Sequence, residues 1–246
     1  MIKNFKWLLL VSLTFVACNS DDAVVVVSNS SDGLPLTAGT ANFSKYVALG
    51  NSLTSGYSDG ALFIQGQEGA YPNVMAQQFA LVGGGAFTTP LMADNIGGLS
   101  SGGNQIPQFP TRFYFFPGST TVAAGPVNVS GVTTTALGAT VSGPFNNMGV
   151  PGAKSFHLVT SGYGTLNPYF GRFASSLGAK VIDDAVAQSP SFFSLWIGGN
   201  DVLSYALSGG TGVNQTVNTN PATYGIDDIT NPNVFAAAFS GMVNSL

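Results

Sequence analysis

The chain has 246 residues, of which 45% are hydrophobic and only 7% are charged. This length and hydrophobic content are sufficient for one domain with a substantial core. The charged fraction lies far below the roughly 25% of an average soluble domain. Because the formal net charge is −4, the chain lacks the basic surface of nucleic-acid-binding proteins, and we expect no nucleic acid partner.

Residues 1–17 predict a secretory signal peptide. Lys3 and Lys6 form a basic start, and an apolar run follows at 7–16. This run of roughly ten residues is too short to cross a bilayer, which requires about 20. We therefore expect residues 1–17 to be removed on export.

Cys18 is the one cysteine of the chain and directly follows Ala17. A single cysteine cannot form an internal disulfide. Its position after a small residue at the end of an apolar run resembles a bacterial lipobox, in which the thiol is acylated and becomes the mature N-terminus. Several acyl chains on one residue would anchor the protein stably to a membrane. The alternative is an ordinary signal peptide in which Cys18 has no role.

Residues 18–42 are predicted to form a tether between this anchor and the domain. They contain a short valine run followed by turn-forming Ser, Asn, Gly and Pro residues. Asp21 and Asp22 resemble the surface-export signal of Bacteroidetes lipoproteins, which implies the outer membrane or cell surface of a Gram-negative bacterium. A solvated start of a linker is the alternative interpretation.

The domain is expected to span residues 43–246 and to begin with a strand, a loop and a helix. The apolar run YVALG at 46–50 is typical of a buried parallel strand. In the segment 71–82, apolar residues recur at helical spacing. These residues are Val74, Met75, Phe79 and Val82.

Residues 83–143 predict an inserted lobe. The segment is rich in glycine, threonine and valine, which favours a few short β-strands or hairpins. A structureless loop of this length inside a domain would be uncommon. Aromatic residues at alternate positions in RFYFFPG, at 112–118, are typical of core side chains. The second interpretation is that they line an acyl-binding groove.

The segment 178–201 combines a helical stripe, an apolar strand and the loop GGND. The stripe contains Val181, Ile182, Ala185 and Val186, and Ser189-Pro190 ends it. Strands that alternate with helices predict a parallel sheet with helices on both faces. Sites in such sheets form beyond the carboxyl ends of the strands.

Three short motifs follow predicted strands in order: GNSL at 50–53, NMGVPGA at 147–153 and GGND at 198–201. Together they resemble the SGNH/GDSL hydrolases, a family of esterases, lipases and acylhydrolases. The resemblance covers about residues 43–206, and the wider text is similar to large GDSL-like lipoproteins of Bacteroidetes. It implies a three-layer α/β/α, flavodoxin-like fold.

The resemblance also implies roles for three residues. Ser52 matches the nucleophile, and its own N–H, the N–H of Gly152 and the side-chain amide of Asn200 match the oxyanion-hole donors. A serine hydroxyl that attacks an ester needs fixed donors for the negative oxygen that develops. The alternatives are a loop serine, a turn glycine and an Asx-turn asparagine. The implied function is a serine ester hydrolase acting on a lipid or acylated glycan.

Other chemistries leave no signal in the sequence. No phosphate-binding G-x-x-x-x-G-K motif occurs, and no His, Cys and carboxylate set has metal-ligand spacing. We therefore expect neither a cofactor nor a metal. Asp201, beside Asn200, is expected to orient its loop rather than to act as a base.

The sequence departs from the family pattern in two ways. Asn51 stands where the family usually has Asp, which is a mild change. The base and its orienting acid should lie in a D-x-x-H motif near the C-terminus, and no such motif occurs. The one histidine, His157, has Lys154 three residues before it, and we expect it to have no catalytic role. Because serine at its free pKa is a weak nucleophile, we expect this chain alone to be weakly active or inactive.

Residues 231–246 predict a helix that starts at Asn-Pro and has no C-cap glycine. In the family this helix should lead to further strands and to the D-x-x-H motif. We therefore expect an amino-terminal fragment of a longer product. Two other interpretations of the whole chain are a non-catalytic lipid- or glycan-binding surface lipoprotein on the same scaffold, and a structural cell-surface β-protein. The helical stripes argue against the last.

Overall fold

A computed structural model describes residues 33–246, of which residues 38–246 cluster as one unit. The predicted signal peptide at 1–17, Cys18 and most of the predicted tether lie outside the described residues. Within residues 33–246, no helix is both long and apolar enough to cross a membrane.

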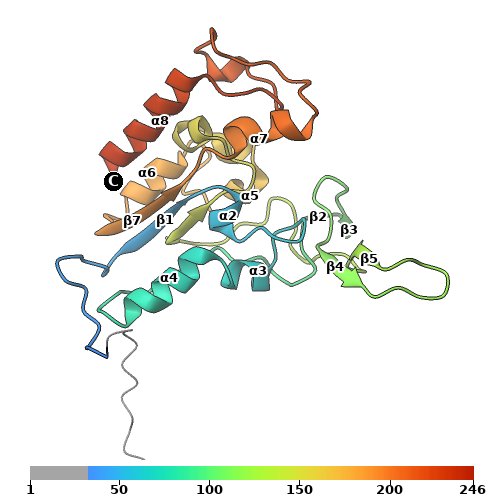
Figure 1. Cartoon of the computed structure of the whole chain (residues 1–246), viewed down its shortest axis with the longest axis horizontal. Helices are drawn as coiled ribbons and strands as arrows, with labels where there is room; N and C mark the ends of the chain where they lie inside the picture. The colour runs from blue at the N-terminus through green and yellow to red at the C-terminus, as the bar shows by residue number, and fades with distance from the viewer. Residues whose placement is uncertain (1–32) are drawn as a thin grey trace, which may run out of the picture. The chain divides into compact units, whose positions relative to one another are not determined.

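Three parallel strands form the central sheet (Figure 1). β1 (Tyr46–Gly50) lies in the middle, between β6 (Asn147–Gly149) and β7 (Phe192–Trp196). Ala48 is in register with Asn147 on one side and with Ser194 on the other. Parallel neighbours require long crossover connections, which in this chain contain helices. The predicted parallel sheet is confirmed.

The residues of β1 point alternately to two apolar layers, as the period of a strand requires. Tyr46 and Ala48 pack with Ala76 of α4 (Tyr71–Ala80). Val47 and Leu49 belong to a larger core on the opposite face. Helices therefore cover both faces of the sheet.

The predicted helix at 71–82 is confirmed in α4, but α4 ends at Ala80, so Val82 lies beyond it, and the buried side of the helix differs from the prediction. Val74 is 47% exposed, whereas Pro72 and Ala76 are buried and Met75 and Phe79 pack against the sheet. Positions 72, 75, 76 and 79 share one helical face because they are three or four residues apart. Val74 points away from that face.

The larger core lies between the sheet and three helical segments. These segments are η1 (Ser155–Val159), α6 (Val181–Val186) and α8 (Pro232–Ser245). Val181, Ala185 and Met242 are fully buried in it. Asn231 caps α8, since its side-chain oxygen accepts from the N–H groups of Asn233 and Val234. The predicted helices at 178–188 and 231–246 are confirmed.

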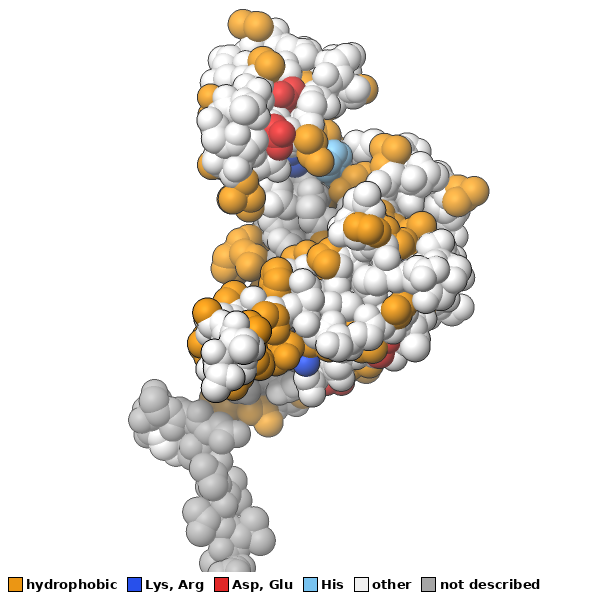
Figure 2. Space-filling view, turned by 90° about the vertical axis from the view of Figure 1, so that its right-hand side faces the viewer, with side chains coloured by type: hydrophobic (Ala, Val, Ile, Leu, Met, Phe, Trp, Pro, Cys, Tyr) orange, Lys and Arg blue, Asp and Glu red, His pale blue; other side chains and the backbone are white. Residues whose placement is uncertain are grey.

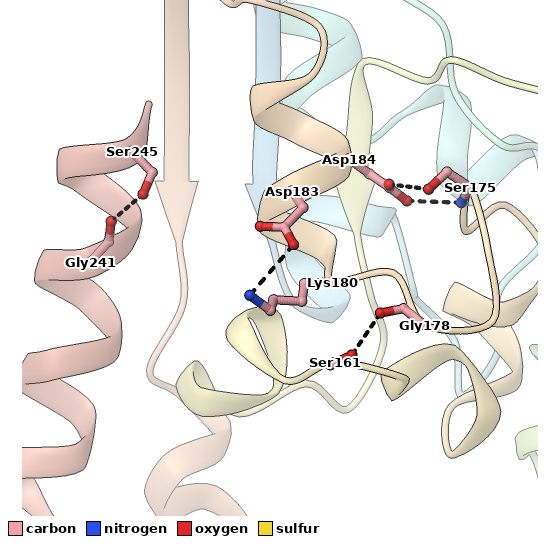
Figure 3. A network of polar contacts seen from close by, with 8 residues as sticks. All are labelled: Ser161, Ser175, Gly178, Lys180, Asp183, Asp184, Gly241 and Ser245. Carbon is pink, nitrogen blue, oxygen red and sulfur yellow. Dashed lines mark hydrogen bonds and ion pairs between the residues drawn. The ribbon is translucent and has the colours of Figure 1, made fainter.

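Polar contacts attach the chain before α6 to that helix (Figure 3). Asp184 accepts hydrogen bonds from the N–H and the hydroxyl of Ser175. Asp183 forms an exposed ion pair with Lys180 at 3.5 Å, which stabilises the fold by at most about 1 kcal/mol. Acidic residues in a first helical turn also interact favourably with the helix dipole. The two aspartates therefore have a structural role.

The chain between α4 and β6 contains two antiparallel hairpins. One pairs β2 (Ser100–Ser101) with β3 (Asn104–Gln105), and the other pairs β4 (Phe113–Phe116) with β5 (Gly125–Asn128). A small core of Leu62, Met92, Leu99 and Tyr169 underlies this region.

Three of the four aromatic residues of β4 are exposed and Phe116 is half-buried, so the prediction that they form core is wrong. Phe115 is 71% exposed, and Phe113 and Tyr114 are also exposed. Neither face of this two-stranded hairpin is covered by a second layer, and Figure 1 shows the hairpin projecting from the body. The alternating aromatic side chains of this hairpin therefore have no second layer of residues to pack against. Figure 2 shows the surface on this side, where hydrophobic side chains are interspersed with few charged ones.

The remaining helices are short and lie in the connections. They are α2 (Ser52–Ser55), α3 (Ile64–Glu68), η2 (Tyr163–Thr165), α5 (Pro168–Gly171), α7 (Asn200–Leu207) and η3 (Pro221–Thr223). Of these, α2 begins two residues after the end of β1 and α7 begins four residues after the end of β7, and they carry two of the predicted site residues.

Candidate active site at the carboxyl ends of the strands

Ser52 is the first residue of α2, two residues beyond the end of β1. Gly50 permits this sharp turn, because a Cβ there would overlap Thr54 Oγ1 and the Trp196 carbonyl oxygen. Asn51 caps α2, since its side-chain oxygen accepts from the Leu53 N–H at 3.2 Å. An aspartate can cap a helix in the same way, so asparagine and aspartate are equivalent in this capping role.

The Ser52 hydroxyl is partly exposed and makes no hydrogen bond to any residue of 33–246. As the first residue of a helix, Ser52 also has a backbone N–H without an intrahelical acceptor. Both groups are therefore free to interact with a ligand.

Gly152 lies in the loop after β6, with φ of +77°. L side chains rarely adopt this conformation. The position is exposed, and a Cβ would meet no atom within 4 Å. The Gly152 N–H has no acceptor in the described part of the chain. The glycine therefore presents a free donor on an open surface.

Asn200 begins α7, so the structure places it in a first helical turn rather than in a loop. Its Nδ2 donates to the Ala153 carbonyl oxygen at 2.9 Å. An amide nitrogen carries two N–H donors, and the second has no partner within residues 33–246. This hydrogen bond holds the amide beside the Gly152 loop.

The three predicted site residues line one pocket of about 420 Å³. They come from three different connections at the carboxyl ends of the strands, as the parallel sheet predicts. Other residues complete the lining: Tyr57, Gln108, Phe109, Pro151, Leu166, Asn167, Pro168 and Tyr169. A single partly apolar cavity is thus lined by residues with a free hydroxyl and free N–H donors, and fixed donors of this kind can stabilise a negative charge on a bound ligand.

Asp201 fixes the loop that carries Gly152. It is buried, and its carboxylate accepts from the Ser155 N–H at 2.9 Å and from the Ser155 hydroxyl at 2.7 Å. These bonds connect α7 to the chain after β6. The contacts agree with an orienting role for Asp201.

Lys154 connects the same loop to the segment 211–230. It is buried, and its Nζ donates to the Asp228 carbonyl oxygen at 2.7 Å. Burial lowers the pKa of Lys154, and the negative charges of Asp201 and Asp228 oppose this shift. The Asp228 carboxylate accepts from the Val213 and Gly225 N–H groups, and hydrogen bonds of this kind lower its pKa.

His157 lies outside the pocket. Its Nδ1 accepts from the Lys154 N–H at 3.0 Å, and its ring stacks on Tyr163 with centroids 4.6 Å apart. Burial lowers the pKa of His157 to about 4, and the Lys154 charge contributes. The neutral ring is therefore a packing and capping element.

The pocket lining contains no Asp, Glu, His or Lys side chain. Its ionisable groups are Tyr57 and Tyr169, and burial raises the pKa of both phenols. Neither phenol is ionised near neutral pH, so neither can accept the Ser52 proton. In addition, no group of three or more His, Cys, Asp and Glu side chains within residues 33–246 could hold a metal ion.

Asn167 is a pocket residue that sequence reasoning missed. Its Nδ2 donates to the Pro151 carbonyl at 2.9 Å, and its side-chain oxygen caps α5. It therefore fixes the residue before Gly152. Asn167-Pro168 is a helix-start signal, and that signal could have placed α5 next to the site.

Comparisons with models of protein families, with curated proteins and with solved structures found no match to the chain.

Proposed function

We propose that the chain is the scaffold of a serine ester hydrolase of the SGNH/GDSL type. Ser52 is the nucleophile, and the oxyanion hole consists of the N–H groups of Ser52 and Gly152 and the side-chain amide of Asn200. The observation that supports this most strongly is that these three residues line one pocket with unbonded donors.

The strand order supports the same proposal. β1 is the first parallel strand of the chain and lies between the second and the third. Flavodoxin-like sheets begin with this order and bind ligands at the carboxyl ends of their strands. The pocket lies at those ends.

In the proposed reaction the Ser52 oxygen attacks the ester carbonyl carbon and the carbonyl oxygen becomes an oxyanion. Fixed N–H donors stabilise that charge, and one such donor is worth about 3 kcal/mol in another serine hydrolase. The alcohol leaves, an ester forms on Ser52, and water releases the acid. The proton of Ser52 needs a base, and the pocket lining supplies no carboxylate or imidazole.

We further propose that the protein is exported, anchored to a membrane through acylated Cys18, and located at the outer membrane or cell surface of a Gram-negative bacterium. Residues 1–22 support this by their sequence alone. Labelling with a radioactive fatty acid tests it, because Cys18→Ala should abolish the incorporation.

A fluorophosphonate probe tests the nucleophile, because it reacts with activated serines. Because the pocket lining supplies no carboxylate or imidazole, we expect slow labelling of the folded protein at Ser52, found by peptide mass spectrometry, and its loss in Ser52→Ala. Ser245→Ala is the matched control, since the Ser245 hydroxyl bonds to the Gly241 carbonyl within α8. Equal labelling of the folded protein and of Ser52→Ala would contradict the proposal.

The second candidate is a non-catalytic binder of lipids or glycans on the same scaffold. The absence of a carboxylate or imidazole from the pocket lining favours it. Ligand binding without any reaction at Ser52 would establish this function instead.

A further inference from the structure

A second cavity, of about 660 Å³, adjoins the Ser52 pocket. The two cavities share Phe109 and Pro168 in their linings. The second cavity, which we name the side groove, continues between the lobe residue Leu137 and the chain from Gly164 to Leu177. Its volume is in the usual range of small-molecule sites.

The lining of the side groove is uncharged and mostly apolar. It contains no Asp, Glu, Lys, Arg or His residue, and glycines contribute part of its wall without a side chain. The whole stretch 113–153, which includes the groove residue Leu137, has no such residue either. An uncharged cavity of this kind offers no ion-pair partner to a phosphate or a carboxylate.

Leucines line both the Ser52 pocket and the side groove. Leu166 lines the Ser52 pocket, and Leu137 and Leu177 line the groove. All three are exposed, and Leu177 is 82% exposed. Exposed leucines in the walls of a cavity are unfavourable in water, and covering them with an apolar ligand is favourable.

Hydroxyl groups in the groove are too few to bind a sugar. The lining includes Thr140, Thr165 and Ser176, and the Thr165 hydroxyl already donates to the Gly162 carbonyl. A sugar ring carries several hydroxyls, and each needs a partner when it is desolvated. A hydrocarbon chain needs none.

We propose that the side groove binds the aliphatic chain of a medium- or long-chain ester whose carbonyl group lies at Ser52. The inference rests on the proposed function for the position of the carbonyl. Phe109 and Pro168 line both cavities, so the two sites adjoin and one extended ligand can reach both.

Equilibrium binding tests the groove without requiring a reaction. The probe is dansylamino-undecanoic acid, and dansylglycine has the same fluorophore and carboxylate without the long chain. Each buried methylene can strengthen binding by about fourfold. We expect the long probe to bind at least about tenfold more tightly than dansylglycine, and Ser52→Ala to keep this preference.

Two variants alter the groove at exposed positions, so that folding is preserved. Leu177→Lys places a charge on the apolar wall, and Ser176→Trp fills the space. We expect each to reduce the affinity for the long probe about tenfold and to leave dansylglycine unchanged. Val217→Lys is the matched control, because Val217 is 98% exposed and lines neither cavity.

Phe115→Ser tests the exposed hairpin as a competing binding surface. We expect it to leave the affinity for the long probe unchanged. Equal affinity for the two probes, equal losses in Leu177→Lys and Val217→Lys, or a loss in Phe115→Ser alone would each overturn the proposal.

Fluorophosphonates with short and long alkyl chains then separate the groove from the nucleophile. We expect the long reagent to label Ser52 faster, and Leu177→Lys to remove that advantage. Tight binding of the long probe without any labelling of Ser52 would refute the hydrolase and retain the groove. Labelling of Ser52 at rates independent of chain length would retain the nucleophile and refute the groove.

Discussion

The Asp201 carboxylate accepts two hydrogen bonds from Ser155, at 2.7 Å from the hydroxyl and 2.9 Å from the N–H. The neighbouring Asn200 donates to the Ala153 carbonyl. Together these three bonds hold the start of α7 against the loop after β6. The Asn200 amide and the Gly152 N–H are therefore positioned by one shared set of contacts.

Asp201→Ala should destabilise the protein and weaken the site together. The Ser155 N–H and hydroxyl would stay buried without an acceptor, and we expect a loss of about 2–4 kcal/mol in the free energy of unfolding. Urea unfolding measures this loss, and fluorophosphonate labelling measures the reactivity of Ser52. Asp183→Ala is the control, because the exposed Lys180–Asp183 pair contributes at most about 1 kcal/mol. Equal effects of the two variants would contradict this role for Asp201.

Gly152→Ala should slow the labelling of Ser52 by more than the loss of unfolding free energy in this variant can explain. At φ of +77° an alanine is strained by about 1 kcal/mol, although no atom lies within 4 Å of its Cβ. Gly209 has φ of +70° and equally open surroundings but lies outside the pocket, so Gly209→Ala is the matched control. We expect similar losses of unfolding free energy and about tenfold slower labelling in Gly152→Ala alone. Slower labelling in both variants would refute a local role for Gly152.

His157 should make the stability depend on pH in a defined window. Burial lowers the pKa of His157 to about 4, below the usual 6.5 of the unfolded chain. The unfolded state therefore binds more protons between these values, so stability is constant above about pH 6.5 and falls as the pH decreases toward 4. We expect a loss of up to about 3 kcal/mol across this window.

Urea unfolding between pH 4.5 and 7.5 measures this dependence. His157→Gln should flatten the curve, because His157 is the one histidine of the chain. The carboxylates Asp94 and Asp228 have lowered pKa values and act at more acidic pH. An unchanged slope in His157→Gln would show that another group titrates.

Phe115→Ser should leave the stability almost unchanged, by about 0.5 kcal/mol or less, because Phe115 lies on the exposed hairpin. Phe170→Ala should cost about 3–5 kcal/mol, since Phe170 is fully buried in the larger core. Thermal and urea unfolding compare the two. A large loss in Phe115→Ser would mean that the hairpin packs against other parts of the chain.

The sheet and the pocket were predictable from the sequence because they depend on local hydrophobic patterns, and each of these patterns favours one type of secondary structure. Short apolar runs that alternate with helical stripes give parallel strands, whose carboxyl ends lie at one edge. Ser52, Gly152 and Asn200 each follow such a run, and their common pocket is the result.

The sequence-based predictions that failed did so for a different physical reason. The aromatic residues at 113–116 alternate like buried residues, but the hairpin has no second layer to pack against. Val74 has helical spacing but lies on the exposed side of α4. The side of α4 that packs against the sheet is the one that carries Phe79, whose ring contacts the aromatic rings of β1 and β7. The side groove was not predictable, since it depends on how the lobe approaches the chain at 164–177.

β7 is an open edge of the sheet, paired on one side with β1 and on the other with no strand of the described chain. Natural edge strands are usually protected by charge or proline, and the sequence FFSLW has neither. The edge therefore presents unpaired backbone groups and half-buried aromatic rings as a template for another strand. We therefore expect this strand to be one site of association between copies, and because no charge on the strand itself repels a second copy, lowering the salt concentration should not by itself prevent it.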